Sequence, residues 1–167
     1  MPKALFLDRD GVINIDKEYL YKIEDFEFCN GVFEVLKHFQ NLGYLLVVVT
    51  NQSGIGRGYY SEEDFLKLTS WMVQEFKNQG ITISKVYHCP HTPQDNCTCR
   101  KPNTGMFELA FEEFGLDMKS SWMIGDKPSD IQAAKKAGVV NTVFIGKEAC
   151  KEAKYSVKSL LDIIKLT

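Results

Sequence analysis

The sequence has 167 residues, of which 44% are hydrophobic and 25% are charged, and its net charge at neutral pH is −2. These values are typical of a globular domain with a sizeable core. Such a weak net charge predicts neither a nucleic-acid nor an anionic-membrane partner, and no apolar run approaches the roughly 20 residues of a membrane span. Met1 leads into the first apolar run without the layout of a signal peptide, so we expect a cytoplasmic monomer.

Short apolar runs alternate with helical patterns along the chain. Runs typical of buried strands lie at residues 4–7, 45–49, 84–87, 121–124 and 140–145. Helical patterns lie at residues 31–42, 61–79, 104–115 and 128–137, with a last one near 156–165. This alternation predicts an α/β fold with a parallel sheet that helices cover on both faces. We expect residues 1–167 to form one domain with a single irregular stretch at residues 88–103.

Two carboxylates, Asp8 and Asp10, follow the first predicted strand. Strand alternation would place both side chains on one face, where like charges repel. A cation, a phosphoryl substrate or both would relieve this repulsion. If Asp8 is a nucleophile and Asp10 an acid/base, the chain transfers phosphoryl groups through an aspartyl-phosphate. The alternative is a polar turn that ends the strand.

Further polar clusters follow two other predicted strands and precede one predicted helix. Residues 50–54 follow the run at 45–49, residues 125–130 follow the run at 121–124, and residues 100–102 precede the helix at 104–115. Ligands of parallel α/β sheets bind outside the carboxyl ends of the strands. We therefore expect these clusters to converge with Asp8 and Asp10 at one edge of the sheet.

The residue types in these clusters suit phosphoryl transfer. Mg²⁺ prefers oxygen ligands, and Asp8, Asp126 and the main-chain carbonyl of Asp10 could supply them. Lys101 and the hydroxyl of Thr50 would stabilise the charge on the transferring oxygens. Asp10 would protonate the leaving oxygen and later accept a proton from water.

Three of these residues also have simpler interpretations. Thr50 could be an ordinary strand-end hydroxyl, and Lys101 could be solvated. Asp130 lies in the first turn of a predicted helix, where it could be a helix-terminus acid or could orient a magnesium-bound water.

The irregular stretch holds a second cluster, formed by Cys89, His91, Cys97 and Cys99. A Cys₃His set is a recognised tetrahedral zinc site, and four protein ligands leave no open position for chemistry. A reducing cytoplasm disfavours disulfides here, so we expect structural zinc. A reactive-cysteine redox switch is the alternative.

Zinc would act on the next two residues of the chain. The loop ends at Arg100 and Lys101, so folding it around a metal would fix both cations. We expect zinc removal to lower activity indirectly. His88 could compete as a ligand, although we expect it to pack at a strand end.

The motifs in combination resemble the haloacid dehalogenase (HAD) superfamily of phosphotransferases. Its four motifs match in order as Asp8-x-Asp10, Thr50, Lys101 and Gly125-Asp126-x-x-x-Asp130. The resemblance spans nearly the whole chain. It implies a doubly wound, Rossmann-like sheet and a magnesium-dependent mechanism with Asp8 as the nucleophile.

Three longer motifs narrow this resemblance to one branch of the superfamily. Asp-Arg-Asp-Gly, Thr-Asn-Gln-Ser-Gly-Ile and a Cys-x-His…Cys-x-Cys loop before Arg-Lys-Pro are shared by heptose 1,7-bisphosphate 7-phosphatases and by the phosphatase domain of bifunctional histidinol-phosphate enzymes. Members of this branch lack a large cap domain, and loops matching residues 14–28, 51–60 and 88–103 shape the pocket. Besides Thr50 and Lys101, the branch's substrate-contacting positions match Asp16, Lys17, Glu18, Tyr19, Asn51, Gln52, Ser53, Arg100 and Lys127.

The charge of these residues favours a sugar bisphosphate. Arg100 and Lys127 would supply the additional cations that a second phosphate needs, so we expect removal of the 7-phosphate from D-glycero-D-manno-heptose 1,7-bisphosphate, a precursor of nucleotide-activated heptose for lipopolysaccharide or capsule. Histidinol phosphate is the alternative, because acids around its ammonium group could be found among Glu18, Glu24, Asp25 and Glu27. A zinc-stabilised binding module without catalysis is a further alternative, but it would not need the intact acid, threonine and lysine set. Only five residues separate His91 from Cys97, fewer than in many members of the branch. The sequence therefore does not predict the shape of the pocket wall or the substrate preference that depends on it.

Overall fold

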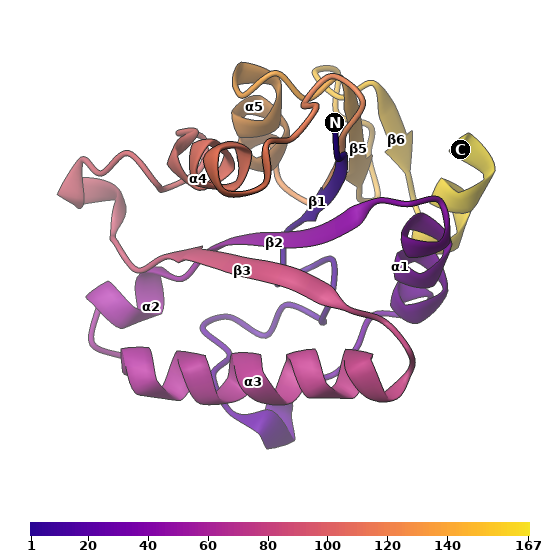
Figure 1. The fold of residues 1–167 in the computed structure, drawn as a ribbon. Coiled ribbons are helices and arrows are strands. Elements are labelled where there is room, and N and C mark those ends of the chain that lie inside the picture. Colours follow the sequence, from indigo (N-terminus) through magenta and orange to yellow (C-terminus); the bar gives the residue numbers. More distant parts are fainter.

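The computed structural model describes residues 1–167, and its centre is a six-stranded parallel sheet of order β3-β2-β1-β4-β5-β6 (Figure 1). The strands are β1 (Ala4–Leu7), β2 (Leu45–Asn51), β3 (Ile83–Cys89), β4 (Trp122–Gly125), β5 (Asn141–Ile145) and β6 (Tyr155–Val157). The chain winds outward from β1 to β3, then returns and winds outward from β4 to β6. This confirms the predicted doubly wound sheet and places its switch point between β1 and β4.

Helices cover both faces of the sheet. They are α1 (Val32–Asn41), α2 (Ser53–Gly56), α3 (Glu62–Asn78), α4 (Gly105–Phe114) and α5 (Pro128–Lys136), with 3₁₀ helices η1 (Ile23–Asp25), η2 (Pro93–Asp95) and η3 (Leu160–Leu166). Figure 1 shows α3 on one side of the sheet and α4 and α5 on the other. None of these helices combines the length and the hydropathy that a bilayer crossing requires.

Alternate residues of β1 bury into two different cores. Leu5 and Leu7 belong to the core that includes α1, α3 and η3, whereas Ala4 and Phe6 belong to the core that includes α4 and α5. The rings of Phe6 and Phe107 lie 4.9 Å apart at their centroids. A strand buried on both faces must be apolar throughout, which is why residues 4–7 form a continuous apolar run.

The longest helix, α3, begins with a reciprocal cap. The Ser61 Oγ accepts a hydrogen bond from the Asp64 N–H at 3.0 Å, and the Asp64 carboxylate accepts one from the Ser61 N–H at 3.0 Å. The helix buries Phe65, Leu68 and Met72 along one side at the spacing of three and four residues that one helical face requires.

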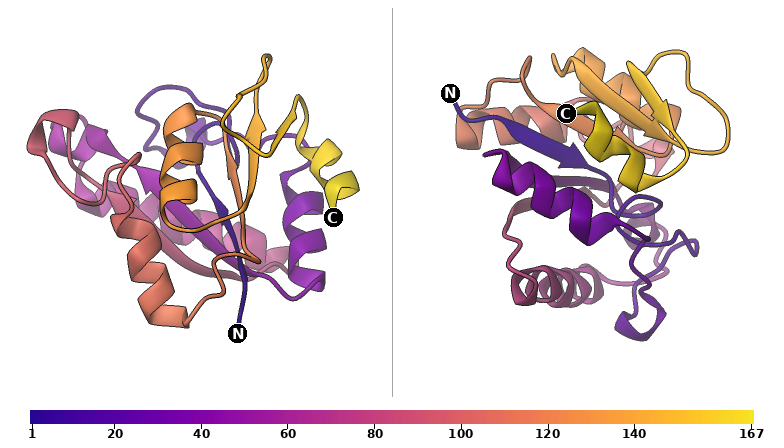
Figure 2. Two further views of the ribbon diagram at one scale, coloured as in Figure 1. Left: turned by 90° about the horizontal axis from the view of Figure 1, so that it is seen from above. Right: turned by 90° about the vertical axis from the view of Figure 1, so that its right-hand side faces the viewer.

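The prediction of a helix near residues 156–165 was wrong at its start and in the type of helix. Residues 155–157 form β6, which pairs with β5, and the last helix is the 3₁₀ helix η3 rather than an α-helix. The ring of Tyr155 stacks on Trp122 with centroids 5.7 Å apart, a contact that favours the extended conformation. The apolar residues that suggested a longer helix lie in η3, beside α1 in both views of Figure 2.

Candidate active site

A cavity of about 680 Å³ opens at the carboxyl edge of the sheet. Its lining includes every predicted substrate residue except Lys17 and the fully buried Thr50, together with Asp10 and Lys101. Lys17 turns away, because its ammonium group donates to the Asp25 carbonyl at 2.9 Å and lies 3.4 Å from Glu27. The structure therefore brings together most of the polar clusters that the sequence placed far apart.

Three carboxylates meet beneath this cavity. Asp8 follows β1, Asp126 follows β4, and Asp130 lies in the first turn of α5, with carboxylate oxygens that lie within 4.8 Å of one another. Burial and the neighbouring charge of Asp130 raise the pKa of Asp8 to about 8 and that of Asp126 to about 7. The cluster holds more negative charge than its surroundings compensate.

Lys101 is the one lysine that pairs with this cluster. Its Nζ lies 3.2 Å from Asp8 Oδ1 and 2.7 Å from Asp130 Oδ1, and it donates to the Val49 carbonyl at 2.7 Å. Burial disfavours the charged ammonium, but Asp130 and Asp8 outweigh this effect and raise the pKa of Lys101. Lys101 is therefore a buried, charged group rather than the solvated lysine of the simpler interpretation.

Asp130 accepts hydrogen bonds from backbone N–H groups at the start of α5 and also pairs with Lys101. Its Oδ2 accepts hydrogen bonds from the N–H groups of Asp126 and Lys127, both at 3.1 Å, while its Oδ1 pairs with Lys101. These contacts match the helix-terminus interpretation of Asp130.

The arrangement of Asp8 and Asp126 fits a divalent cation. Asp126 Oδ1 is buried and has no hydrogen-bond partner, and the main-chain carbonyl of Asp10 accepts no hydrogen bond. Gly11 leaves the room that the Asp126 carboxylate occupies, because a Cβ there would lie 1.9 Å from Asp126 Oδ2. Two carboxylates and one carbonyl are the oxygen donors that Mg²⁺ prefers.

Asp10 is oriented by three donors. Its Oδ1 accepts from Arg9 Nη2 at 2.8 Å and from Asn14 Nδ2 at 3.0 Å, and its Oδ2 accepts from Gln52 Nε2 at 3.0 Å. Arg9 is 1% exposed and also donates to the Leu20 carbonyl. Neither Arg9 nor Asn14 was predicted as part of the site. Strand alternation would send Arg9 to the opposite face, and only the turn after β1 returns it to Asp10.

The outer wall of the cavity carries unpaired cations. Arg57, Arg100 and Lys127 line it and form no ion pair. Arg57 was not predicted; its Nε donates to Ser53 Oγ at 3.3 Å, and its guanidinium lies 5.8 Å from the ring centroid of Tyr19. Its position in the loop at residues 51–60 was the one available signal.

Glu18 and Tyr19 turn their loop into the cavity through an uncommon backbone conformation. Their φ angles are 55° and 54°, in the left-handed region that non-glycine residues rarely adopt. Strain of this kind costs about 1 kcal/mol or more at each residue and tends to occur where a binding site requires it.

The four predicted zinc ligands converge in the loop beyond β3. One ligand atom from each of Cys89, His91, Cys97 and Cys99 lies within 4.8 Å of the others. The sulfur atoms of Cys89 and Cys99 are in contact, so this pair alone could also form a disulfide. A disulfide would not require the His91 Nδ1 to lie 3.2 Å from Cys99 Sγ, nor the Cys97 Sγ to lie 3.5 Å from Cys89 Sγ. The convergence of all four donors fits zinc.

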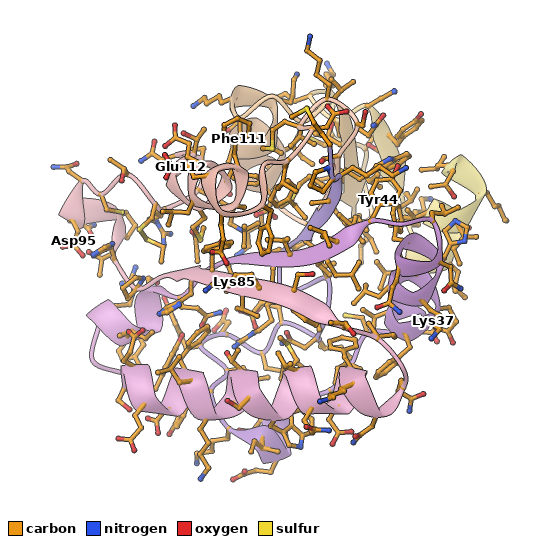
Figure 3. The ribbon with its side chains drawn as sticks, in the orientation of Figure 1. Lys37, Tyr44, Lys85, Asp95, Phe111 and Glu112 are labelled. Atoms are coloured by element: carbon orange, nitrogen blue, oxygen red, sulfur yellow. A yellow bond between two sulfur atoms is a disulfide. The ribbon has the colours of Figure 1, made fainter.

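The contacts around this loop agree with the prediction that His88, just before it, packs at a strand end and is not a zinc ligand. It projects beyond β3, with Asp95 near its far end (Figure 3), and the Pro90 carbonyl accepts from the Gly56 N–H at 2.9 Å. His88 stays outside the ligand set, because its ring stacks on Phe65 and its Nε2 contacts Glu62. The loop is not wholly irregular, since β3 extends to Cys89 and η2 lies within it.

Comparisons with known proteins agree with the family that the sequence motifs resemble. A HAD-hydrolase-like family model matches residues 98–159. The chain is 54% identical to D-glycero-alpha-D-manno-heptose-1,7-bisphosphate 7-phosphatase of Campylobacter jejuni, over 97% of this chain and 94% of the relative. It is 45% identical to the beta-named enzyme of Helicobacter pylori, over 98% of each chain. The crystal structure of D,D-heptose 1,7-bisphosphate phosphatase from B. bronchiseptica, complexed with magnesium and phosphate, superposes with a TM-score of 0.88 at 25% identity, covering 98% of this chain and 97% of that one.

Proposed function

Because the chain belongs to the family of heptose-1,7-bisphosphate 7-phosphatases within the HAD-like hydrolases, we propose that it removes the 7-phosphate of D-glycero-D-manno-heptose 1,7-bisphosphate. The observation that carries the proposal is the division of charge in the cavity. Lys101 lines the cavity and lies 3.2 Å from Asp8, which is buried beneath it, while Arg57 and Arg100 line its wall without carboxylate partners. One phosphate would react at the base, and the cations of the wall would hold the other.

The reaction begins at Asp8. Its carboxylate attacks phosphorus, a bond forms between Asp8 and the phosphoryl group, and the bond from phosphorus to the sugar oxygen breaks. Asp10 gives the departing oxygen a proton, and it then takes a proton from the water that hydrolyses the aspartyl-phosphate. Each step returns Asp10 to the protonation state that the next step requires.

Lys101 and Thr50 act on the transferring phosphoryl group. Lys101 is held at Asp8 by its contacts with Asp130 and the Val49 carbonyl, so its charge is in place before the substrate arrives. A preorganised charge costs no reorganisation during the reaction. Asp8, Asp126 and the Asp10 carbonyl would hold magnesium, which neutralises the carboxylates and polarises the phosphate when bound.

The distribution of acids supports a sugar bisphosphate over histidinol phosphate. Of the four acids that kept histidinol phosphate open, only Glu18 lines the cavity; Glu24 lines a separate hollow and Lys17 contacts Glu27 outside the site. Asp16 and Glu18 are suited to accept hydrogen bonds from sugar hydroxyls.

The zinc loop has a supporting role in this proposal. Lys101 is joined to β2 by Asn51, whose Oδ1 accepts from the Lys101 N–H at 3.0 Å and whose Nδ2 donates to the Lys101 carbonyl at 3.2 Å. Zinc at Cys97 and Cys99 would hold the chain just before Arg100. Thiolate ligands require a reducing compartment, so we place the enzyme in the cytoplasm, where we expect it to act on its small substrate as a monomer.

A phosphate-release panel with magnesium tests the substrate. It compares the α and β anomers of heptose 1,7-bisphosphate with histidinol phosphate and with sugar monophosphates. The proposal expects a kcat/KM at least about tenfold higher for a heptose bisphosphate, because an arginine–phosphate contact contributes about 1.5–3 kcal/mol. A higher kcat/KM for histidinol phosphate would overturn it.

A further inference from the structure

Both the nitrogen and the oxygen of the Gln52 side-chain amide form hydrogen bonds inside the site. Its Nε2 donates to Asp10 Oδ2 at 3.0 Å and to Thr50 Oγ1 at 2.9 Å, and its Oε1 accepts from the Tyr60 hydroxyl. The side chain of Gln52 is buried at 3% exposure. Since a carboxylate only accepts and a tyrosine hydroxyl donates to the amide oxygen, these partners fix which end of the amide faces Asp10.

Tyr60 is itself held in place, so it can serve as the anchor of Gln52. Its ring stacks on Tyr21 with centroids 5.3 Å apart and an interplanar angle of 11°. Gly54 provides the space for the ring, because a Cβ there would lie 2.1 Å from Tyr60 Cε1. Burial raises the pKa of Tyr60 to about 12, so its hydroxyl keeps the proton that it donates.

These contacts determine where Asp10 can carry a proton. Oδ1 accepts from two donors, Arg9 and Asn14, whereas Oδ2 accepts from Gln52 alone. Because each carboxylate oxygen offers about two acceptor positions, Oδ2 keeps one of them free, and the proton for the leaving oxygen belongs there. Rotation of the Gln52 amide would remove the constraint that distinguishes the two oxygens.

The same amide sets the direction of the Thr50 hydroxyl. Because Thr50 Oγ1 accepts the N–H of Gln52, its own hydrogen remains available to donate. The one hydrogen bond that this hydroxyl donates goes to the Asn51 carbonyl at 3.5 Å, a weak contact that a phosphoryl oxygen would replace.

We propose that Tyr60 and Gln52 form a positioning pair that orients the acid/base Asp10 and the phosphoryl donor Thr50 as one unit. Neither residue of the pair reacts; each acts through the two groups that Gln52 contacts. This inference rests on the proposed phosphatase activity and adds Tyr60 to the residues on which that activity depends.

The leaving group of the substrate separates the two effects of the pair. A sugar alkoxide needs the proton from Asp10, whereas p-nitrophenolate leaves without one. Both esters need Thr50. In Tyr60→Phe we expect kcat to fall about tenfold on heptose 1,7-bisphosphate and about threefold on p-nitrophenyl phosphate, the range of one hydrogen bond, with KM within about twofold on both.

Tyr59→Phe is the matched control, because Tyr59 is 56% exposed and its hydroxyl lies outside the network. It should keep both rates within about twofold. An equal loss on both esters in Tyr60→Phe would refute the link to Asp10, and no loss on either would refute the pair. If the unmodified enzyme prefers another alkyl phosphate, the proposed substrate is wrong, and the same comparison is made with that ester.

Gln52→Glu alone tests the pair in the case in which Tyr60→Phe is poorly folded, as judged by its thermal midpoint, and a double-mutant cycle adds a second test where Tyr60→Phe is folded. Gln52→Glu removes both amide N–H donations and should lower kcat on the alkyl phosphate by at least about a hundredfold. If the two residues act as one unit, adding Tyr60→Phe to Gln52→Glu lowers kcat by less than about twofold more. Independent, multiplied losses would overturn the proposal.

Discussion

Replacing Gly11 by alanine should separate magnesium binding from folding. Gly11 has a φ of +89°, and its missing side chain leaves room for the carboxylate of Asp126. An added Cβ would lie 1.9 Å from Asp126 Oδ2 and 2.4 Å from its Cγ. Since ordinary contact begins at 3.4 Å, the carboxylate must retreat by about 1.5 Å, the difference between 3.4 and 1.9 Å.

The substitution should lower both folding stability and magnesium affinity, and the two effects are measured separately. The left-handed backbone costs alanine about 1–2 kcal/mol in folding stability, which lowers the thermal midpoint by roughly 2–8 °C in a chain of this size. The displacement of Asp126 removes one of the two carboxylate ligands. By comparison with losses of outer-shell partners, we expect the magnesium concentration for half-maximal activity to rise at least about tenfold to a hundredfold.

Gly43→Ala is the control for the backbone cost alone. Gly43 has a φ of +90°, but nothing lies within 4 Å of the position that its Cβ would take. It should lose similar stability and keep the magnesium dependence of the unmodified enzyme. The prediction is refuted if Gly11→Ala reaches half-maximal activity at the magnesium concentration of the unmodified enzyme, or if that concentration rises equally in Gly43→Ala.

Three further changes test other parts of the site. Asp8→Asn should lower kcat by at least about a thousandfold without lowering the thermal midpoint, because it removes one of three clustered carboxylates; retained phosphate release would contradict the nucleophile. Asp130→Asn should cost about 3 kcal/mol in urea denaturation, since it breaks a buried pair with Lys101, whereas Asp162→Asn, in an exposed pair at 3.8 Å, should cost less than about 0.5 kcal/mol. Zinc chelation with magnesium restored should lower kcat and release about one zinc per chain with four free thiolate or imidazole donors; unchanged activity after measured zinc loss would separate the loop from Lys101.

The parts of the site that strands position were predictable from the sequence. Asp8 and Asp126 each follow a short apolar run, and a parallel sheet brings such positions to one edge. Loop-borne residues were harder to place. Lys17 was expected to line the pocket, but the left-handed residues Glu18 and Tyr19 reverse the loop just after it, and no alternating pattern encodes such a turn.

Hydrogen-bond networks within the site were the least predictable part. Asn14 and Tyr60 lie in segments whose sequence has no helical or strand periodicity, and neither residue type by itself indicates a site. Their roles arise from their contacts with Asp10 and Gln52 in the folded chain. The C-terminal prediction failed for a related reason. The pairing of Val157 with Ile145 in the sheet outweighed a local helical pattern that continues only in η3.

The two halves of the cavity are attached to the fold in different ways, and this bears on how the family can diversify. Asp8 and Thr50 are fixed by buried strands at the centre of the sheet, whereas Glu18 and Arg57 belong to surface connections. Loop exchanges leave a buried sheet largely unstrained. New specificities can therefore evolve, or be engineered, by changing the parts of these connections that carry Glu18 and Arg57. If Asn14, Gln52 and Tyr60, which orient the catalytic groups, are kept, substrate choice changes while the chemistry is inherited intact.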